Sequence, residues 1–457
     1  MLERVAAHLE AYLRSTGITP AATIQTALGI SQPTLSRAIA ALGPVVIRIG
    51  RARATHYAHA RNVGLHGSSW PLYRIDAAGR PATHGTLTAL HGEAFAYSAQ
   101  DYAELWHAGT RPPGAFAQLP WFLADLRPGG FLGQHYARRH ATELAAPPQL
   151  EHWRTDHVMA ALLTHGEDLP GDFVLGQAML ERVQRAHLRP PPAVVAADRG
   201  TRYAELAAEA VTGETARPSL GGEFPKFATC VHLGEDRYRH VLVKFTETAN
   251  TPAKRRWVDL LICEHLAARV LAGQGIAAAA SELVVAGERL CLEVERFDRI
   301  GAHGRRGTVT LAALDDAFHD QHDDWPHAAA RLARDGWIDA PTLATIRWLH
   351  AFGMLIANTD LHFGNLSFHT QAARPLALAP AYDMLPMLYR PAATGEIVER
   401  EFQPPLPLPE ARASWQLAAT LATTFWRAVE ADARVSLPFR RIAGANAALI
   451  QRARDAA

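Results

Sequence analysis

The segment WLHAFGMLIANTDLHFGNLSFH, residues 348–369, constrains the fold more than any other part of the chain. Its apolar residues predict a helix that runs into a polar loop and then into a short strand. Asp360 and Asn365 stand five residues apart in that loop, and Asp383 follows Asp360 by 23 residues in ALAPAYDML. The fold must therefore bring polar side chains from two loops together.

The types and spacing of these side chains indicate phosphoryl transfer. Asp-x-x-x-x-Asn followed by a second Asp is the pattern that protein-kinase-like phosphotransferases use. An ionised carboxylate can accept the proton of an acceptor hydroxyl, whereas Mg²⁺ prefers hard oxygen ligands in octahedral geometry. We therefore expect ATP and Mg²⁺ as cofactors.

A nucleotide-binding segment is expected between residues 217 and 245. It divides into a Gly-rich turn, a strand, a tight turn at 234–236 and a second strand that ends at Lys244. Gly221 and Gly222 have no Cβ, so their backbone N–H groups can approach a phosphate closely. The spacing is not that of a Walker A loop, and two adjacent glycines alone are a weak signal.

Lysine is scarce in this chain, which makes Lys244 informative. Arginine supplies all but three of the 46 cationic residues, and the lysines stand at positions 226, 244 and 254. A strand lysine after a Gly-rich loop can pair with the α- and β-phosphates of ATP. A helix is expected over 254–272 with Glu264 on its apolar side, where a carboxylate needs a partner. Lys244 is the expected partner of Glu264. Asp259 on the same helix is the alternative partner of Lys244.

Residues 2–61 carry a local positive charge in a chain whose formal net charge is +1. Seven arginines and two glutamates give this segment a net charge of +5, which favours binding of a polyanion. Periodicity predicts three helices, and the runs VVIRIG and ATHYAH predict a hairpin with a basic tip. The pattern resembles a winged helix-turn-helix, in which the third helix reads the major groove and the wing contacts phosphate. The expected DNA contacts are Gln32, Thr34, Ser36 and Arg37 on the third helix, and Arg51 and Arg53 on the wing.

Five motifs, SLGGEFPK, VLVKF, VERFDR, NTDLHFGNLSF and AYDML, resemble in content and order those of the HipA family of bacterial serine/threonine kinases, the toxins of certain toxin–antitoxin pairs. The resemblance extends from about residue 71 to residue 427 and includes PLYRID and FLADLRPGGFLG. A fused helix-turn-helix is typical of the YjjJ-type branch, whereas other members bind DNA through a separate antitoxin. The resemblance implies that DNA binding is built into this chain.

The resemblance also implies roles for individual residues. Asp360 would be the catalytic base, Asn365 and Asp383 the Mg²⁺ ligands, Lys244 the phosphate-binding lysine, and Glu295 and Phe297 the adenine hinge. Gly221, Gly222 and Glu264, singled out above from the residues themselves, are expected at the same nucleotide site. Ser219 matches the loop serine whose phosphorylation displaces the Gly-rich loop and stops the kinase. Two positions depart from the family pattern: Gly364 replaces a frequent lysine, and Phe224 replaces a frequent polar residue.

The expected fold is α+β, a bilobal protein-kinase-like (HipA-like) fold with an N-terminal winged helix-turn-helix domain. The expected boundaries are 1–62 for the winged helix-turn-helix, 63–185 for a HipA-type N-terminal subdomain and linker, 186–300 for the kinase-like N-lobe and 301–457 for the helical C-lobe. The expected partners are a protein substrate, double-stranded DNA through residues 1–62 and an antitoxin protein.

A cytoplasmic protein, on the nucleoid when bound to DNA, is expected. No apolar stretch approaches the roughly 18 uninterrupted residues of a membrane span, and charges interrupt the start of the chain where a signal peptide needs an apolar run. Three scattered cysteines without a CxxC pair fit a reducing compartment. No membrane partner is therefore expected.

Other interpretations stay open from sequence alone. The chain would be a DNA-binding regulator if its kinase domain were a catalytically weak pseudokinase, although the motif residues are retained. A metal-dependent nucleic-acid hydrolase would use Asp360, His362 and Asp383 as ligands, but their spacing matches no nuclease motif. As an alternative to DNA binding, the basic residues of the N-terminal segment would simply face solvent, or the winged helix would contact another protein. The tract 315–324, DDAFHDQHDD, mixes Asp with His as a second metal site would, but it lacks a ligand-specific spacing and is expected to be a solvated acidic loop. His362 is expected to be a hydrogen-bond donor that braces its loop rather than a metal ligand.

Overall fold

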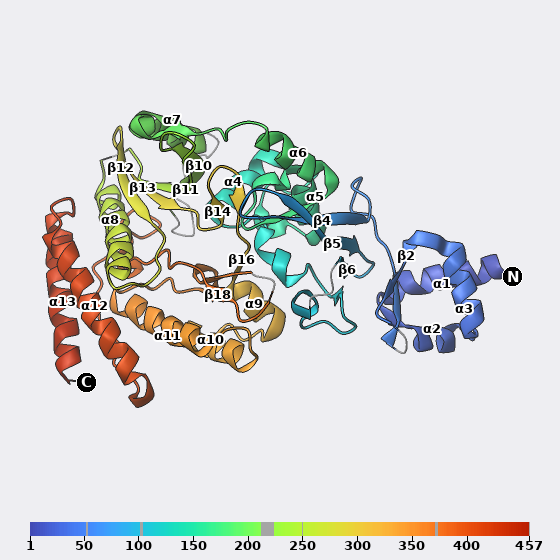
Figure 1. Cartoon of the computed structure of the whole chain (residues 1–457). Coiled ribbons are helices and arrows are strands. Elements are labelled where there is room, and N and C mark those ends of the chain that lie inside the picture. Colours follow the sequence, from blue (N-terminus) through green and yellow to red (C-terminus); the bar gives the residue numbers. More distant parts are fainter. Residues whose placement is uncertain (52–53, 101–103, 212–223, 249, 371–372, 457) are drawn as a thin grey trace. The chain divides into compact units, whose positions relative to one another are not determined.

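The computed structural model describes residues 1–457 except 52–53, 101–103, 212–223, 249, 371–372 and 457 (Figure 1). The described chain forms two compact units. Unit 1 comprises Met1–Gly129 and Gly133–Arg189, and unit 2 comprises Gly130–Leu132 and Pro190–Ala457. Arg53, Ser219, Gly221 and Gly222, which the sequence singled out, lie outside the described residues.

Unit 1 begins with short helices packed against a small sheet (Figure 1). The helices are α1 (Leu2–Thr16), α2 (Ala21–Leu28) and α3 (Gln32–Leu42), and the sheet has the order β1-β3-β2, with β1 (Thr19–Pro20), β2 (Val46–Ile49) and β3 (His56–His59). Strands β2 and β3 pair in an antiparallel manner, which confirms the predicted hairpin. Leu9, Leu13, Ile24 and Leu35 are fully buried, because each helix has one apolar face.

The rest of unit 1 is built on a five-stranded antiparallel sheet in the order β7-β6-β5-β4-β8. Its strands are β4 (Ser69–Ile75), β5 (Pro81–Ala89), β6 (Phe95–Ala99), β7 (Ala115–Phe116) and β8 (Phe173–Leu175). The carboxylate of Asp76 closes the β4–β5 turn by accepting from the backbone N–H groups of Ala78 and Arg80, both at 2.8 Å. The helices that accompany the sheet are α4 (Gly130–His140), α5 (Thr155–His165) and α6 (Gln177–His187).

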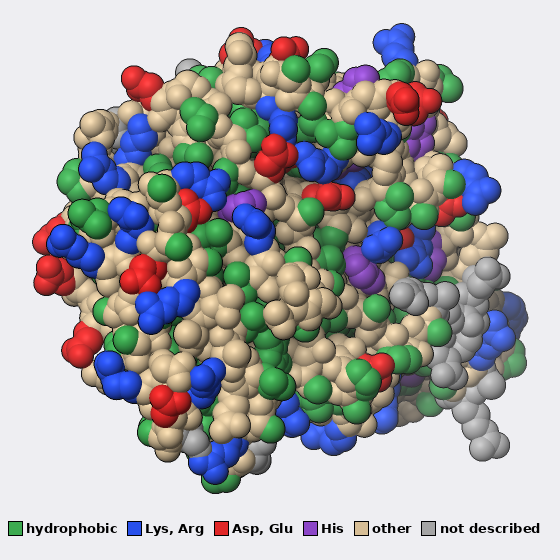
Figure 2. Space-filling view, turned by 60° about the vertical axis from the view of Figure 1, so that its left-hand side comes forward, with side chains coloured by type: hydrophobic (Ala, Val, Ile, Leu, Met, Phe, Trp, Pro, Cys, Tyr) green, Lys and Arg blue, Asp and Glu red, His purple; other side chains and the backbone are tan. Residues whose placement is uncertain are grey.

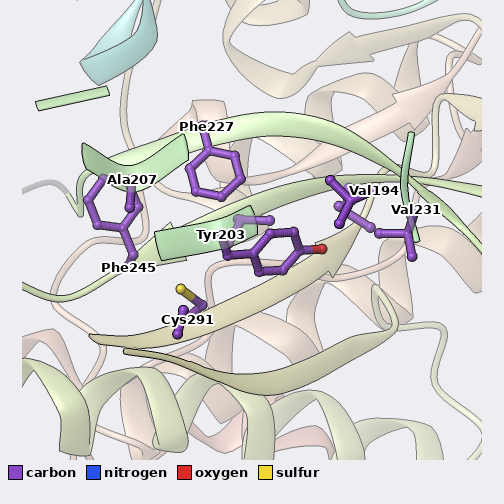
Figure 3. Packing of buried hydrophobic residues seen from close by; sticks show 10 residues of the cluster. Val194, Tyr203, Ala207, Phe227, Val231, Phe245 and Cys291 are labelled. Carbon is purple, nitrogen blue, oxygen red and sulfur yellow. The ribbon is translucent and has the colours of Figure 1, made fainter. Parts of the chain in front are cut away.

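Unit 2 begins with a five-stranded sheet in the order β12-β13-β11-β10-β9. The strands are β9 (Val194–Val195), β10 (Lys226–His232), β11 (Tyr238–Phe245), β12 (Ser281–Ala286) and β13 (Arg289–Glu295), and two helices, α7 (Arg199–Val211) and α8 (Pro252–Gly273), pack against them. Val243 and Phe245 belong to a buried cluster with Tyr203 of α7 (Figure 3). Because side chains alternate along a strand, Lys244 between them projects to the opposite face.

The remainder of unit 2 is mainly helical. Its helices are α9 (Leu311–Phe318), α10 (Trp325–Arg334), α11 (Ala340–Leu355), α12 (Arg412–Ala431) and α13 (Leu437–Ala456), and its short strands are β14 (Arg299–Ile300), β15 (Gly304–Arg305), β16 (Thr308–Thr310), β17 (Ser367–His369) and β18 (Ala377–Leu378). Helix α12 packs against both α11 and α13, with Phe352, Phe425 and Trp426 fully buried (Figure 1). The mixture of sheets and helices is the predicted α+β class.

The expectation of a solvated acidic loop at 315–324 is wrong for its first residues. Asp315 lies in α9, and its side chain is only 1% exposed. Its carboxylate accepts bonds from the backbone N–H groups of Gln321 and His322 and from Arg331, each at 3.0 Å. These bonds compensate the burial of the charge, so the segment after α9 is a turn organised by a buried carboxylate.

The surface has no strong bias toward one charge on the face shown in Figure 2, where basic and acidic side chains are interspersed. This agrees with the formal net charge of +1. In the part of the chain that the structure describes, no helix is both long and apolar enough to cross a membrane.

Candidate active site

Lys244 is the centre of a buried polar cluster in unit 2. It lies on β11, directly opposite Lys226 on β10 and Leu292 on β13. Its Nζ donates to both carboxylate oxygens of Glu264 on α8, at 2.7 and 2.8 Å. The two side chains are 5% and 6% exposed, so this is the buried pair that the sequence predicted.

The alternative partner Asp259 is engaged elsewhere. It is also buried on α8, but its carboxylate accepts bonds from the backbone N–H and the hydroxyl of Ser436, both at 2.7 Å. Asp259 therefore tethers the start of α13 to α8 and takes no part in holding Lys244.

Asp383 is the second carboxylate that binds Lys244, through its Oδ1 atom. Its side chain is 31% exposed, so one side of this contact is open. The backbone before Asp383 runs beside the start of β12, because the N–H of Ala279 donates to the carbonyl of Ala381 at 2.9 Å. The φ of Asp383 is +55°, in the left-handed region that residues other than glycine rarely occupy.

The three charges at this cluster depend on one another. Burial disfavours the ammonium, but the carboxylates of Asp383 and Glu264 raise the pKa of Lys244 above its usual value. Burial opposes ionisation of Asp383 as well, and the two ammonium groups of Lys244 and Lys226 lower the pKa of that carboxyl. Burial raises the pKa of Glu264, and Lys244 partly offsets the rise. Lys244 and Asp383 are therefore charged at neutral pH.

The loop after α11 is organised around Asp360. Asn358 is 2% exposed and accepts from the backbone N–H of Asp360 at 3.0 Å, while its Nδ2 donates to the carbonyl of Asp383 at 3.2 Å. Asn365 donates from Nδ2 to the carbonyl of Asp360 at 2.9 Å. The loop that holds Asp360 and Asn365 is thus joined to Asp383 through Asn358.

His362 braces this loop as an acceptor, which corrects the expectation of a donor. Its Nδ1 accepts from the backbone N–H of Gly364 at 3.1 Å, and its carbonyl accepts from Trp325 Nε1 at 3.1 Å. Tyr382 donates to the carbonyl of Gly364 at 2.7 Å. A Cβ at position 364 would lie 3.0 Å from the His362 ring, so glycine at this position leaves room for the imidazole.

A small cavity adjoins the Lys244–Glu264 pair. It is lined by Glu264, Ala268 and Leu271 of α8, by Ala279, Ser281 and Val294, and by residues 381–384. Because Glu264 and Asp383 contribute to its wall, the cavity is part of the same site.

Comparisons with known proteins fit this arrangement. A family model described as the HipA-like C-terminal domain matches residues 218–451. A relative, Toxin YjjJ of Escherichia coli (strain K12), is 36% identical over 433 residues, which cover 93% of this chain and 94% of that protein. The chain belongs to the HipA-like toxin family. A second model, described as the YjjJ-like toxin middle domain, matches residues 66–184.

A solved structure resembles this HipA-like chain in fold. It comes from the complex of HipA, HipB and operator DNA of the Shewanella oneidensis MR-1 toxin–antitoxin system. The TM-score is 0.52 at 17% identity, and the match covers 84% of this chain and 95% of that one. The fold is therefore the mixed α+β, kinase-like fold of HipA.

The two residues expected at the adenine hinge lie at the end of β13. The backbone N–H of Glu295 already donates to the carbonyl of Ala280 at 2.8 Å, and its side chain is exposed. The ring of Phe297 lies 5.6 Å from that of Tyr382 and 5.9 Å from that of His369. The ring of Phe297 therefore lies beside two residues of the segments that follow the Asp360 loop. The backbone N–H of Glu295 is instead already used in a hydrogen bond to Ala280.

The expected DNA contacts lie on the surface of unit 1. Gln32, Ser36 and Arg37 of α3 and Arg51 of the hairpin tip are exposed, and Thr34 is partly exposed. Leu35 and Ala38 on the same helix are fully buried, so α3 presents its polar side outward. The structure agrees with the predicted orientation of these side chains.

Two residues of the site were not singled out from the sequence. Lys226 lies opposite Lys244 across the β10–β11 pair, and its charge lowers the pKa of Asp383. The scarcity of lysine was the signal that could have identified it. Asn358 stands two residues before Asp360 in the same motif, but only the structure reveals that it also bonds to the carbonyl of Asp383.

Proposed function

We propose that this HipA-like chain is an ATP- and Mg²⁺-dependent serine/threonine protein kinase with a built-in DNA-binding domain. The observation that carries the proposal is the Lys244 ammonium held between Glu264 and Asp383. A lysine fixed in this way presents a positive charge at a defined place for the phosphates of a nucleotide. Lys226 on the adjacent strand would add a second charge.

Asp360 is proposed as the catalytic base. Its side chain is partly exposed, and no side chain in the described part of the chain donates to its carboxylate. The oxygens are therefore free to orient a substrate hydroxyl and to accept its proton. Asn358 is proposed as a positioning residue, because it fixes the backbone of Asp360 relative to that of Asp383.

Asn365 and Asp383 fit the requirements of a Mg²⁺ site. Asn365 uses its Nδ2 for the carbonyl of Asp360, which leaves its Oδ1 as a ligand, and Asp383 uses Oδ1 for Lys244, which leaves Oδ2. Both atoms are hard oxygen donors. Bound Mg²⁺ would neutralise charge that develops on the transferred phosphoryl group.

We propose that Ser219 is the site of autophosphorylation. The modification would add about −2 charge next to Gly221 and Gly222, in a loop that would otherwise receive phosphate. The phosphorylated loop would be repelled from the nucleotide site, and the kinase would be shut off.

DNA binding is proposed for residues 1–62, as a winged helix-turn-helix. The support is a net charge of +5 over residues 2–61, the exposed polar side of α3 and the antiparallel β2–β3 hairpin. The resembling HipA structure contains HipB and operator DNA, so an antitoxin partner is proposed as well. We also propose domain boundaries at residues 185 and 300. The kinase is proposed to act on a protein substrate, in the cytoplasm or on the nucleoid.

A hydrolase site built from Asp360, His362 and Asp383 has less support. Among the described residues, the groups of His, Cys, Asp and Glu whose ligand atoms lie within 4.8 Å of one another do not include this set. His362 Nδ1 is also occupied by the backbone of Gly364.

Phosphoryl transfer is tested by incubating the purified full chain with γ-labelled ATP and Mg²⁺ and mapping the labelled residue. We expect transfer by the wild type and none by Asp360→Ala, which should still bind ATP because the base contacts the acceptor hydroxyl. Asp335→Ala, a surface carboxylate of the same unit, is the matched control and should transfer normally. Label on the wild type and on Asp360→Ala at equal rates would remove Asp360 from the mechanism, and no label at all would favour the pseudokinase.

A further inference from the structure

A cluster of metal-ligand side chains lies in unit 1, whereas the proposed kinase site lies in unit 2. His140 Nδ1 and His165 Nε2 both lie 3.0 Å from Glu143 Oε2. The ligand atoms of the three side chains all lie within 4.8 Å of one another. Two imidazoles and one carboxylate that converge in this way form a donor set that transition metals bind.

The fold holds the backbone of these residues in place before any ion binds, although the Glu143 side chain is 52% exposed. Helix α4 ends at His140, and the following turn is closed by the backbone N–H of Leu144, which donates to the carbonyl of His140 at 2.9 Å. Leu144 is buried in a cluster with Ala160 and Ala161 of α5, the helix that ends at His165. The turn that carries Glu143 is therefore held against α5 by apolar packing.

The local electrostatics favour a cation. His140 and His165 are the last residues of α4 and α5, where the helix carbonyls carry partial negative charge. Both imidazoles point a nitrogen atom at the same oxygen of the Glu143 carboxylate, which supplies a negative charge between them. The side chains of His140 and His165 are 21% and 22% exposed, so part of each imidazole reaches solvent.

We propose that His140, Glu143 and His165 bind one divalent transition-metal ion of the Zn²⁺ or Co²⁺ type, with water in the remaining position. Ligand atoms that share a tetrahedral zinc ion lie about 3.3 Å apart, given metal–ligand bonds of about 2.0–2.2 Å. The two observed separations of 3.0 Å need to open by only a few tenths of an ångström. On binding, each neutral imidazole would carry its proton on the other ring nitrogen, so that His140 Nδ1 and His165 Nε2 each offer a lone pair to the ion.

The chemistry of the donors selects the class of metal. Imidazole nitrogen suits Zn²⁺, Co²⁺ and Ni²⁺, whereas Mg²⁺ and Ca²⁺ prefer oxygen ligands alone. The bound ion would tie the end of α4 and its turn to the end of α5 and would stabilise unit 1. This inference goes beyond the proposed kinase function and does not depend on it.

A second group, Asp316, Asp320 and His322, provides the comparison. Its ligand atoms are also within 4.8 Å of one another, but all three side chains are exposed and two of them are carboxylates. Asp315 holds the backbone of His322, but this group offers only one imidazole, so we expect it to bind a transition-metal ion more weakly than the group of His140. Its histidine therefore supplies a matched control variant.

The test uses the untagged full chain, stripped of metal with a chelator and titrated with Co²⁺. Visible absorption reports the coordination of the ion, and elemental analysis after dialysis against Zn²⁺ reports the stoichiometry. We expect one tightly bound equivalent in the wild type and in His322→Gln. Glu143→Gln and His165→Gln should each bind Co²⁺ at least about tenfold more weakly. Replacing a residue that only supports a metal ligand already weakens metal binding by about 10–100-fold, so loss of a ligand should cost at least the lower figure.

A measurement on the wild type guards against variants that fail to fold. Zn²⁺ should raise its thermal midpoint, because an ion that binds the folded chain stabilises it in proportion to the logarithm of its concentration. An unchanged midpoint without a Co²⁺ band would mean a hydrogen-bonded cluster only and would overturn the proposal. Loss of the bound metal ion in His322→Gln, but not in His165→Gln, would also overturn the proposal. Phosphoryl transfer should be equal in all these variants, so failure here is distinguishable from failure of the kinase proposal.

Discussion

Glu264→Gln is the substitution that tests the buried cluster most directly. Glutamine keeps the volume of glutamate and can still accept one hydrogen bond from Lys244, but it removes a negative charge that lies 2.7 and 2.8 Å from Nζ. Asp383 then becomes the only carboxylate bonded to Lys244 within the described residues. We expect the ammonium to shift toward Asp383 and away from the place at which it would meet phosphate.

The expected magnitude follows from the burial of the pair. Removing one partner of a buried ion pair costs about 3–5 kcal/mol, and a hydrogen bond to a charged group contributes about 1.5–3 kcal/mol. The substituted amide retains one such bond, so we expect the free energy of unfolding of unit 2 to fall by about 2 kcal/mol. The displaced ammonium should weaken ATP–Mg²⁺ binding about tenfold, which corresponds to about 1.4 kcal/mol.

The assay combines urea unfolding, followed by circular dichroism, with calorimetric titration of ATP–Mg²⁺. Because the chain has two units, the transition that belongs to unit 2 is the one that the nucleotide shifts. Asp259→Asn is the control, because Asp259 is also buried on α8 but accepts its hydrogen bonds from Ser436. It should lower stability and leave ATP affinity unchanged. Equal ATP affinity in Glu264→Gln and Asp259→Asn would refute the reasoning.

Four further predictions concern single groups. Asp383→Asn should lose the Mg²⁺ dependence of nucleotide affinity, and an unchanged Mg²⁺ titration would place the ligand elsewhere. Prolonged incubation with ATP should phosphorylate Ser219, and mass spectrometry that finds it unmodified counts against this regulation. Arg51→Ala should make the log–log salt dependence of DNA binding shallower by about one unit, whereas Arg37→Ala should cost about 1–3 kcal/mol at preferred sequences and less elsewhere; equal effects of both changes on all sequences would contradict the two roles. Burial opposes ionisation of Asp315, but bonds from two backbone N–H groups and a guanidinium lower its pKa, so its stabilising effect should be present above the unfolded pKa of about 3.9 and lost as the pH falls below it. Asp315→Asn should remove that part of the acid dependence in urea unfolding, and an unaltered acid limb would exclude it.

Short-range patterns predicted much of this architecture. The hairpin of β2 and β3, the β10–β11 pair that ends near Lys244, and the helix that carries Glu264 all follow from periodicity and turn residues that act within a few positions. The Lys244–Glu264 pair was also predictable, because a lone carboxylate on an apolar helix face requires a cation and this chain has few lysines.

Contacts between distant segments were beyond the reach of such patterns. Asp383 stands 139 residues after Lys244, and their contact depends on the segment around Ala381 running beside the start of β12. The role of Asn358 depends on the same placement. Likewise, Asp315 was misjudged because the charge of the tract 315–324 suggested solvent, whereas the bonds that compensate its burial come from a turn and from α10.

The scarcity of lysine acquires a physical reason at this site. An ammonium has three N–H donors that point in different directions, and Lys244 uses them on two oxygens of Glu264 and one of Asp383. A guanidinium can also join two carboxylates, as Arg199 does for Glu282 and Glu293, but its donors are spread over a planar group, whereas the ammonium of Lys244 is a compact charge on one nitrogen atom. Lys254 follows the same logic, since its Nζ reaches the carbonyls of Thr248 and Glu288 at 3.0 and 2.8 Å. In a chain that otherwise uses arginine, lysine at 244 lets oxygen atoms of α8 and of Asp383 meet at a single nitrogen atom.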